Sequence, residues 1–310
     1  MRPVETPTDA DVRAARERIR GLVRETPLVE SAELGAQLKL ESLQPTGSFK
    51  VRGAAAALTA LGSGARVVAA SAGNHGLSVA WAAEKLGIEA TIVVAETASP
   101  VKVEAIRRFP ATLVVHGADY DEAEAHALSL VGDGARYVSP YNDRDVIAGA
   151  GTIGLELLDE LGSELTIVVP VGGGGLAAAI GLVAAPAGAR VVGVVAEASP
   201  AMRAALAAGE AVPVPVRETL ADGLAGNIEP GSVTIPLCSR LLDDLVAVSE
   251  EELADAMRFL ARAEGLVVEG SGAAAVAALR AGRVEIEGTA VAIVSGRNVT
   301  LDSLVSVLTI

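Results

Sequence analysis

The residue with the clearest chemical potential is a lysine in the segment Pro45-Thr-Gly-Ser-Phe-Lys-Val-Arg-Gly53. Lys50 stands among small residues at the predicted start of an alanine-rich helix. The positive end of the helix dipole favours the neutral amine at such a position. A neutral amine can form a Schiff base with an aldehyde. Taken alone, Lys50 is more typical of a solvated helix lysine.

A second segment, Ser71-Ala-Gly-Asn-His-Gly76, stands between a predicted strand and a predicted helix. Free backbone N–H groups at a helix N-terminus bind carboxylates well, and Asn74 adds a side-chain amide to the same turn. His75 on its own is more typical of a packed or surface residue than of a catalytic one. The turn therefore predicts a carboxylate site.

The third segment is Val171-Gly-Gly-Gly-Gly-Leu176, which follows a predicted strand. Four glycines let several N–H groups point at one phosphate. No Gly-Lys-Ser/Thr follows, so the segment is not a P-loop, and it lacks the glycine spacing and the later acidic residue of a dinucleotide site. A tight turn is the alternative, but a turn does not need four glycines.

The fourth segment, Ser295-Gly-Arg-Asn298, directly follows the last predicted strand. Open α/β sheets bind ligands at the carboxyl ends of their strands, which is where Ser295 would lie. A Schiff-base lysine, a carboxylate turn, a phosphate loop and a terminal hydroxyl are together the groups that pyridoxal phosphate requires.

The four segments together resemble those of fold-type II pyridoxal-phosphate enzymes, most closely the threonine/serine dehydratase and serine racemase branch. The resemblance extends from Thr26-Pro-Leu28 to Asn298, and Asp145–Glu156 and Ala221-Asp-Gly-Leu-Ala225 also match. It implies a cofactor bound by Lys50, with Phe49 packed beside it, Asn74 at the ring hydroxyl and Ser295 at the pyridine nitrogen. It implies a phosphate site formed by Gly172, Gly173, Gly174, Gly175 and Leu176. It implies a substrate carboxylate site formed by Ser71, Ala72, Gly73, Asn74 and His75.

Three features of the resemblance distinguish the reactions within this family. The segments Ser48-Phe-Lys-Val-Arg52 and Asn74-His75 are typical of the dehydratase–racemase branch rather than of the synthase branches. Racemisation needs a second acid or base opposite the lysine, and Ala72 stands where serine racemases carry that serine. A hydroxyl such as that of Ser295 beside the ring nitrogen leaves the ring a weaker electron sink, which suits elimination.

The sequence therefore predicts β-elimination from a 3-hydroxy amino acid to give a 2-oxo acid and ammonia. Threonine and serine are the leading substrates, and 3-hydroxyaspartate, phenylserine or a modified hydroxy amino acid stay open. The alternatives are an amino-acid racemase, a lyase or synthase acting on another β-substituted amino acid, and a non-enzymatic binding protein. Lys50 counts against the last, because binding alone needs no Schiff base.

Several residues depart from the pattern of the family. Glu269-Gly replaces the common Glu-Pro near the ring, and Arg297 replaces a glycine, where it either points to solvent or selects an acidic substrate. Related enzymes bind Mg²⁺ or Ca²⁺ through a Glu, a backbone carbonyl and an acid, which correspond to Glu197, Ala201 and Arg203. Because a hard cation wants oxygen ligands, no divalent metal is expected, and Arg203 is expected to pair with Glu197 or to face solvent.

Short β-branched runs alternate with alanine-rich helical stretches along the chain, which predicts an α/β fold. The predicted strands are 66–71, 91–95, 112–115, 166–170, 190–196 and 289–294. The predicted helices are 77–86, 100–108, 119–131, 145–161 and 176–183, and a capping box at Ser249–Glu252 opens another that runs to 263. Strands that are apolar on both faces indicate parallel sheets covered by helices. A proline- and glycine-rich stretch, 209–236, is either an excursion near the site or merely a long loop.

The resemblance adds an architecture similar to that of tryptophan synthase β, with two open, mostly parallel sheets. It implies a large cofactor-binding domain of residues 1–65 plus 143–310 and a small mobile domain of residues 66–142. It also implies a homodimer. The chain ends soon after Asn298, so an isoleucine-regulated domain is not expected, and the predicted role is catabolic with hyperbolic kinetics.

Composition limits the partners and the setting of the protein. The 310 residues include 25 Lys and Arg against 39 Asp and Glu, a net charge of −14, so nucleic acid is not an expected partner. Hydrophobic residues make up 51%, which is enough for a large core. The only cysteine, Cys238, excludes a disulfide framework and a cysteine zinc cluster. The charged N-terminus and the lack of a long uncharged apolar run predict a cytoplasmic protein without membrane contact.

Overall fold

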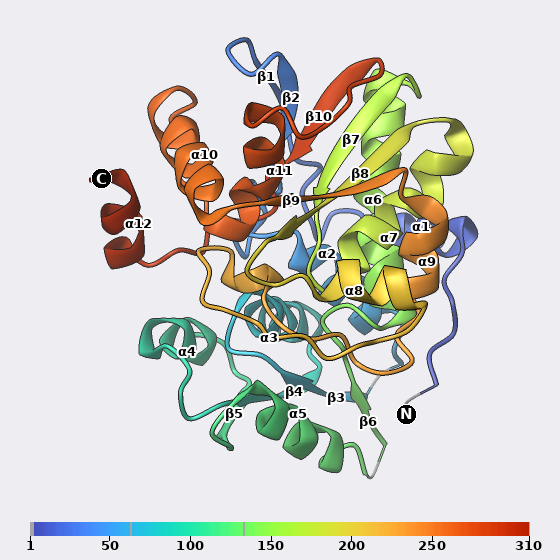
Figure 1. The fold of residues 1–310 in the computed structure, drawn as a ribbon. Helices are drawn as coiled ribbons and strands as arrows, with labels where there is room; N and C mark the ends of the chain where they lie inside the picture. Colours follow the sequence, from blue (N-terminus) through green and yellow to red (C-terminus); the bar gives the residue numbers. More distant parts are fainter. Residues whose placement is uncertain (1–2, 63, 133, 310) are drawn as a thin grey trace.

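The computed structural model describes residues 3–62, 64–132 and 134–309 as an α/β fold built on two sheets (Figure 1). A six-stranded sheet has the order β1-β2-β10-β7-β8-β9, and a four-stranded sheet has the order β5-β4-β3-β6. All strand pairs among the described residues are parallel except β1 with β2. The predicted fold class, with two open and mostly parallel sheets, is confirmed.

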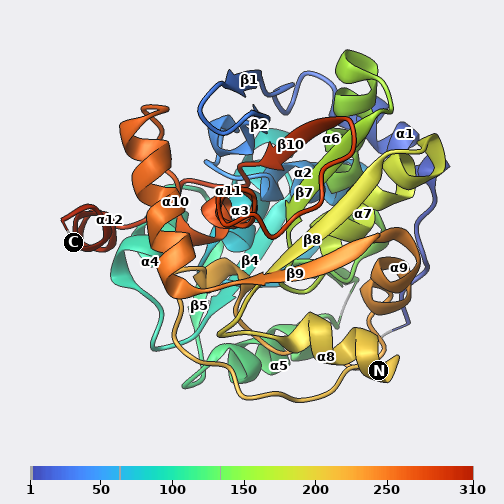
Figure 2. The same ribbon diagram turned by 45° about the horizontal axis from the view of Figure 1, so that its top comes forward.

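The strands and helices follow one another along the chain as the parallel sheets require. The six-stranded sheet contains β1 (Leu28–Ser31), β2 (Ala36–Lys39), β7 (Leu165–Pro170), β8 (Arg190–Ala196), β9 (Asp244–Val248) and β10 (Thr289–Ile293). The four-stranded sheet contains β3 (Arg66–Ala70), β4 (Glu89–Val94), β5 (Thr112–Val115) and β6 (Ala135–Tyr137). The α-helices are α1 (Asp9–Ile19), α2 (Lys50–Thr59), α3 (Asn74–Leu86), α4 (Pro100–Arg107), α5 (Tyr120–Ser129), α6 (Arg144–Leu161), α7 (Gly175–Ala184), α8 (Ala201–Ala208), α9 (Thr234–Leu241), α10 (Glu250–Arg262), α11 (Gly270–Arg280) and α12 (Leu301–Leu308). Figure 2 shows β10, β7, β8 and β9 as neighbouring arrows of one sheet.

The core of the larger sheet is built from small aliphatic side chains that let helices approach closely. Every residue of β7 and of α7 is buried. A Cβ added to Gly151 of α6 would lie 2.8 Å from the carbonyl oxygen of Ala179 in α7. Such packing gives the glycine loop between β7 and α7 a rigid base.

The four-stranded sheet lies entirely within residues 66–142, the segment predicted to be a small mobile domain, and the six-stranded sheet uses residues on both sides of it. The division into domains and the mobility of the small one stay predictions. No helix among the described residues is both long enough and apolar enough to cross a membrane.

The stretch 209–236 lies over the glycine loop rather than away from it. It is irregular apart from the 3-10 turn η3 (Asp222–Leu224) and the start of α9. A Cβ added to Gly172 would lie 3.0 Å from the Cα of Leu224. Of the two predictions for this stretch, an excursion near the candidate site is correct.

Candidate functional site

Lys50 is held against the segment that follows β10. It is the first residue of α2, and the backbone N–H of Phe49 donates to the Ser295 carbonyl at 3.0 Å. Ser48 and Gly296 form an antiparallel bridge beside this contact. Two segments far apart in the sequence are therefore joined by backbone contacts at the carboxyl end of the sheet.

The amine of Lys50 points inward. Its Nζ donates to the carbonyl oxygen of Pro140 at 2.7 Å and lies 5.0 Å from the centre of the Phe49 ring. Burial lowers the pKa of Lys50 to about 8, and the nearby Glu269 carboxylate opposes part of that shift. About a tenth of the amine is therefore neutral at pH 7, far more than in an ordinary lysine. The direction of the shift is the one expected from the sequence, but burial rather than the helix dipole is its principal cause.

The glycine loop is enclosed on several sides so tightly that no side chain fits. Gly174 caps α7 with a φ of +84°, and a Cβ there would lie 2.5 Å from Cε of Met202. A Cβ at Gly173 would lie 2.5 Å from the Tyr141 ring, and one at Gly175 would lie 2.9 Å from Cβ of Tyr141. The loop presents backbone N–H groups at the N-terminus of α7, which is the arrangement that binds an anion. Leu176 is buried in the first turn of that helix.

The segment after β6 supplies residues that the sequence did not single out. The backbone N–H of Glu229 donates to the Tyr141 hydroxyl at 2.9 Å, and that of Val233 donates to the Asn142 side chain at 3.1 Å. Pro140 accepts the hydrogen bond from Lys50. The sequence carried no clear signal for these residues, because β6, the strand that they follow, has only three residues and was not predicted.

Asn74 joins the two sheets through its side-chain amide. Its Nδ2 donates to Oε1 of Glu269 at 2.7 Å, and its Oδ1 accepts from Nδ2 of Asn298 at 2.6 Å. Burial and the neighbouring Asp222 raise the pKa of Glu269 to about 7, against the effect of the Asn74 hydrogen bond. The carboxyl of Glu269, whose role the sequence left open, is thus a buried group directly bonded to a predicted site residue.

The turn from Ser71 to His75 opens α3, which begins at Asn74, three residues earlier than predicted. The Gly73 N–H donates to Oγ of Ser71 at 3.1 Å, and Ala72 is half-buried beside it. His75 turns inward, with Nε2 bonded to the Val138 carbonyl at 2.8 Å. Burial and the Lys50 charge lower the pKa of His75 to about 4, so its ring is neutral. Any anion at this turn is therefore bound by backbone N–H groups rather than by an imidazolium.

Ser295 is buried at the end of β10. Its Oγ donates to the Ser271 carbonyl at 3.4 Å, a long and weak hydrogen bond. The hydroxyl is therefore only loosely engaged by the protein. Arg297 is exposed, which favours an orientation toward solvent.

The expected pair between Arg203 and Glu197 is wrong. Nη2 of Arg203 instead donates to the Leu245 carbonyl at 3.3 Å, because α8 directs the side chain toward β9. Both Arg203 and Glu197 are exposed. The His, Cys, Asp and Glu side chains within the described ranges form no group of three or more that could hold a metal ion.

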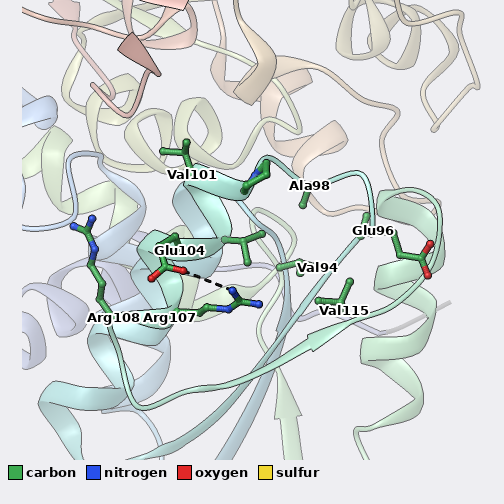
Figure 3. A pocket seen from close by; sticks show the side chains of 11 residues that line it. Val94, Glu96, Ala98, Val101, Glu104, Arg107, Arg108 and Val115 are labelled. Carbon is green, nitrogen blue, oxygen red and sulfur yellow. Dashed lines mark ion pairs between the residues drawn. The ribbon is translucent and has the colours of Figure 1, made fainter. Parts of the chain in front are cut away.

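A separate pocket of about 610 Å³ lies between β4, α4 and β5 (Figure 3). Its lining includes Val94, Ala98, Val101, Arg107 and Val115, and it contains none of the site residues named above. The pocket exposes one side of α4 to solvent.

The amino-acid sequence of this chain is similar to that of a known family and of several named proteins. The family described as pyridoxal-phosphate dependent enzyme matches residues 19–296. The L-threonine ammonia-lyase of Thermotoga maritima is 41% identical over 307 residues, covering 95% of this chain and 76% of that protein. A catabolic L-threonine dehydratase of Staphylococcus aureus is 36% identical over 315 residues, covering 96% of this chain and 91% of that protein.

Solved structures agree with the sequence relatives. Maize serine racemase superposes with a TM-score of 0.91 at 30% identity, covering 98% of both chains. The processed form of threonine deaminase isoform 2 from Solanum lycopersicum superposes with a TM-score of 0.87 at 31% identity, covering 99% of this chain and 96% of the other.

Proposed function

The chain belongs to the family of pyridoxal-phosphate dependent enzymes, and on that basis we propose that it is an ammonia-lyase acting on L-threonine or L-serine. The elimination breaks the α-C–H bond and the β-C–O bond and releases water. Hydrolysis of the resulting enamine then consumes one water, breaks the C–N bond and yields a 2-oxo acid and ammonia. Relatives named as L-threonine ammonia-lyase and L-threonine dehydratase, at 36–41% identity over most of the chain, support this function.

The observation that carries the proposal is the position of Lys50. Its amine is shifted toward the neutral form and is held beside the Ser295 segment by the Phe49–Ser295 hydrogen bond. A binding protein would gain nothing from such an amine, because a desolvated lysine costs stability. A neutral amine can instead form a covalent bond to an aldehyde and can later accept a proton.

The residues fit pyridoxal phosphate. A Cβ at Gly173, Gly174 or Gly175 would clash with its neighbours, and one at Gly172 would be tightly packed. The N–H groups at the start of α7 form a phosphate site. Ser48 Oγ and His75 Nδ1 are buried without a hydrogen-bond partner among the described residues. Because buried polar atoms normally have a partner, these two atoms are free to form hydrogen bonds with a ligand. Lys50 would hold the cofactor, with Phe49 beside it, Asn74 at the ring hydroxyl and Ser295 at the ring nitrogen.

Each group of this chain has a defined task in the elimination. Bound pyridoxal phosphate supplies the electron sink for charge that develops at the substrate α-carbon. The turn Ser71–His75 binds the substrate carboxylate with its backbone N–H groups. Lys50 Nζ, once free and neutral, accepts the α-proton. The Tyr141 ring and the residues of η3 cover the glycine loop and exclude water from it.

Amino-acid racemisation is the second candidate, because maize serine racemase has nearly the same fold. Ala72 argues against it, since a methyl group cannot transfer a proton to the face opposite Lys50. The proposal therefore includes little racemisation. An Ala72→Ser variant that gains racemase activity would support this assignment of the opposite face.

The proposal also includes independence from a divalent metal at Glu197. Arg203 replaces a carboxylate with a guanidinium, and a hard cation is repelled by a nearby positive charge. Activity is expected to survive chelation, and Arg203→Asp is expected to create a response to Mg²⁺. Loss of activity with chelator and recovery with Mg²⁺ in the wild type would contradict the proposal.

The remaining parts of the proposal concern the whole chain. Residues 66–142 form a small mobile domain, and residues 1–65 plus 143–310 form the large domain that holds the cofactor. The enzyme acts as a cytoplasmic homodimer on a small amino acid. The single cysteine, Cys238, is buried and free, so the assembly does not need a disulfide.

The test is a substrate panel with the pyridoxal-phosphate-loaded protein. L-Threonine, L-serine, 3-hydroxyaspartate and phenylserine are each assayed for 2-oxo acid and ammonia in equal amounts. L-Threonine or L-serine should give the highest kcat/KM, and Lys50→Ala should lose nearly all activity with each substrate. A loaded wild type without ammonia release from any of the four would refute the lyase function.

A further inference from the structure

An ion pair joins the helix α4 to the turn η3, and neither of its side chains has yet been given a role in the proposed reaction. Lys102 Nζ in α4 contacts Oδ2 of Asp222 in η3, across 120 positions of sequence. α4 belongs to the segment of the four-stranded sheet, whereas η3 belongs to the stretch that covers the glycine loop. The Lys102 side chain is 31% exposed and that of Asp222 is 56% exposed, so the pair lies at the surface where the two parts meet.

The turn that carries Asp222 is fixed to the candidate site. The Gly223 N–H donates to Oγ of Ser271 at 2.9 Å, and Ser271 lies in the first turn of α11. Leu224 packs against Gly172, as described above. Movement of η3 would therefore disturb both the glycine loop and the helix that begins directly after Glu269.

The helix that carries Lys102 is, by contrast, weakly held. Ile106 is its only buried residue, and Val101 is 65% exposed. The pocket in Figure 3 lies along another side of α4. Because few apolar contacts fix α4, a single polar contact to η3 has a large share in setting its position.

Asp222 and Lys102 are also electrostatic neighbours of the Asn74–Glu269 hydrogen bond. The negative charge of Asp222 raises the pKa of Glu269, and the positive charge of Lys102 lowers it. The Lys50 amine is also close enough to Glu269 for the two charges to interact. The ion pair is thus close enough to the Asn74–Glu269 hydrogen bond for both of its charges to affect Glu269. Its two members shift the pKa of Glu269 in opposite directions.

We propose that Lys102 and Asp222 are positioning residues for the elimination. Their ion pair holds α4 against η3, and in this way it keeps Asn74 in contact with Glu269 while the substrate is bound. Neither side chain touches the reacting atoms. The inference depends on the lyase function proposed above, because it concerns how the substrate-bound site is kept closed.

The test is a double-mutant cycle in the loaded enzyme with Lys102→Met, Asp222→Asn and the double variant. Each single variant should lower kcat/KM about two- to five-fold, the range that a half-exposed ion pair can account for. The double variant should lose no more than the worse single variant, because the two changes break one contact. Losses that multiply, or no loss in any variant, would overturn the proposal.

The pH profile provides a readout that a purely structural role would not give. The pKa of Glu269 should appear in the pH profile of kcat/KM. Lys102→Met should raise this pKa and Asp222→Asn should lower it, since each variant removes one of two opposing charges. Shifts in the same direction would contradict the proposal. A matched control is the Arg16–Asp159 pair, with exposures of 29% and 60%, which links α1 to α6 away from the site. Arg16→Met and Asp159→Asn should leave kcat/KM unchanged.

Hydrogen exchange of the α4 amides tests the same contact without turnover. Exchange of the amides of residues 101–107 should become faster in both single variants and in neither control variant. Unchanged exchange would overturn the ion-pair role. If the variants show this exchange difference but the wild type releases no ammonia, the lyase function is refuted while the contact itself is established.

Discussion

At the residue scale, the chemistry depends on a single amine whose surroundings change its proton affinity. Lys50 is half-buried, hydrogen-bonded to the Pro140 carbonyl and close to Glu269. Burial disfavours the charged form, while the carboxylate favours it. The balance brings the pKa of Lys50 to about 8, which suits an amine that must be both a nucleophile and a base.

This shift predicts the pH dependence of cofactor capture by the cofactor-free protein. Only the neutral amine reacts, and a cation loses its proton as the pH rises, so the rate should increase with pH and be half-maximal at about pH 8. Stopped-flow absorbance after mixing with pyridoxal phosphate measures this rate. A midpoint near the ordinary lysine value of 10.5 would show that the amine is not desolvated in solution.

Several site residues could be predicted from sequence because their residue types are unusual for their position. Four consecutive glycines have few structural explanations, and Lys50, which alone would be typical of a solvated helix lysine, becomes informative beside them. Tyr141 and Asn142 could not be found in this way, because their roles arise from contacts with residues 229 and 233, about 90 positions away. The predicted Arg203–Glu197 pair was wrong for a related reason, since the partner of a helix side chain depends on where the helix packs, whereas the alternative of an exposed Arg203 agrees with the structure.

At the element scale, the shape of the glycine loop depends on neighbouring residues that pack directly against the glycine backbone, where a side chain would otherwise lie. Gly173→Ala would push a methyl group into the Tyr141 ring. Overpacking of this kind costs about 1–3 kcal/mol, so the dissociation constant of pyridoxal phosphate should rise about five- to hundred-fold. Fluorescence titration of the cofactor measures the change.

The matched control for that prediction is Gly132→Ala. Gly132 has no atom within 4 Å of an added Cβ and does not have a positive φ, so the substitution should leave cofactor affinity unchanged. Equal affinities for wild type and Gly173→Ala would show that Tyr141 moves away freely and does not shape the loop.

A buried ion network fixes α2, and with it Lys50, on α6. Arg52 is buried and donates to Glu41 at 2.8 Å and to Glu156 at 2.6 Å, and Lys39 pairs with Glu156 at 2.6 Å. Arg52→Met leaves two carboxylates facing each other without the guanidinium. The free energy of unfolding should fall by about 3–5 kcal/mol, as measured by urea denaturation.

The same network predicts a loss of stability in acid. Burial alone would raise the pKa of Glu41, but the charge of Arg52 outweighs it and holds the pKa below the usual 4.5. A carboxyl with a lowered pKa contributes stability that is present above its unfolded value and is lost as the pH falls through its folded value. The wild type should therefore lose stability steeply in that acidic range, and a flat dependence there would contradict the ion pairing.

The strand–helix alternation could be predicted because strands buried on both faces have a simple apolar pattern. The capping box at Ser249 and the bounds of most central strands agree with the structure to within one or two residues. The elements that the sequence did not reveal carry weaker patterns. β6 has only three residues, and α1 buries only Val12, Ala15 and Ile19 along a charged helix.

At the scale of the whole molecule, the candidate site lies where the segments of the two sheets meet. Asn74 contacts Glu269 and Asn298, Lys50 contacts Pro140, and Lys102 contacts Asp222. Most of these contacts are polar, and polar contacts can be broken and remade more easily than a packed apolar interface. This arrangement is suited to a site that must open to admit an amino acid and close to exclude water.

The central claim is that this site eliminates rather than racemises, and the partition of L-serine between the two reactions tests it most directly. Loaded wild-type protein is incubated with L-serine, and ammonia and D-serine are measured in the same sample over time. Because Ala72 cannot carry a proton to the second face, ammonia should form at least about ten times faster than D-serine. D-Serine forming as fast as ammonia would contradict the account, because a second proton carrier would then have to operate opposite Lys50.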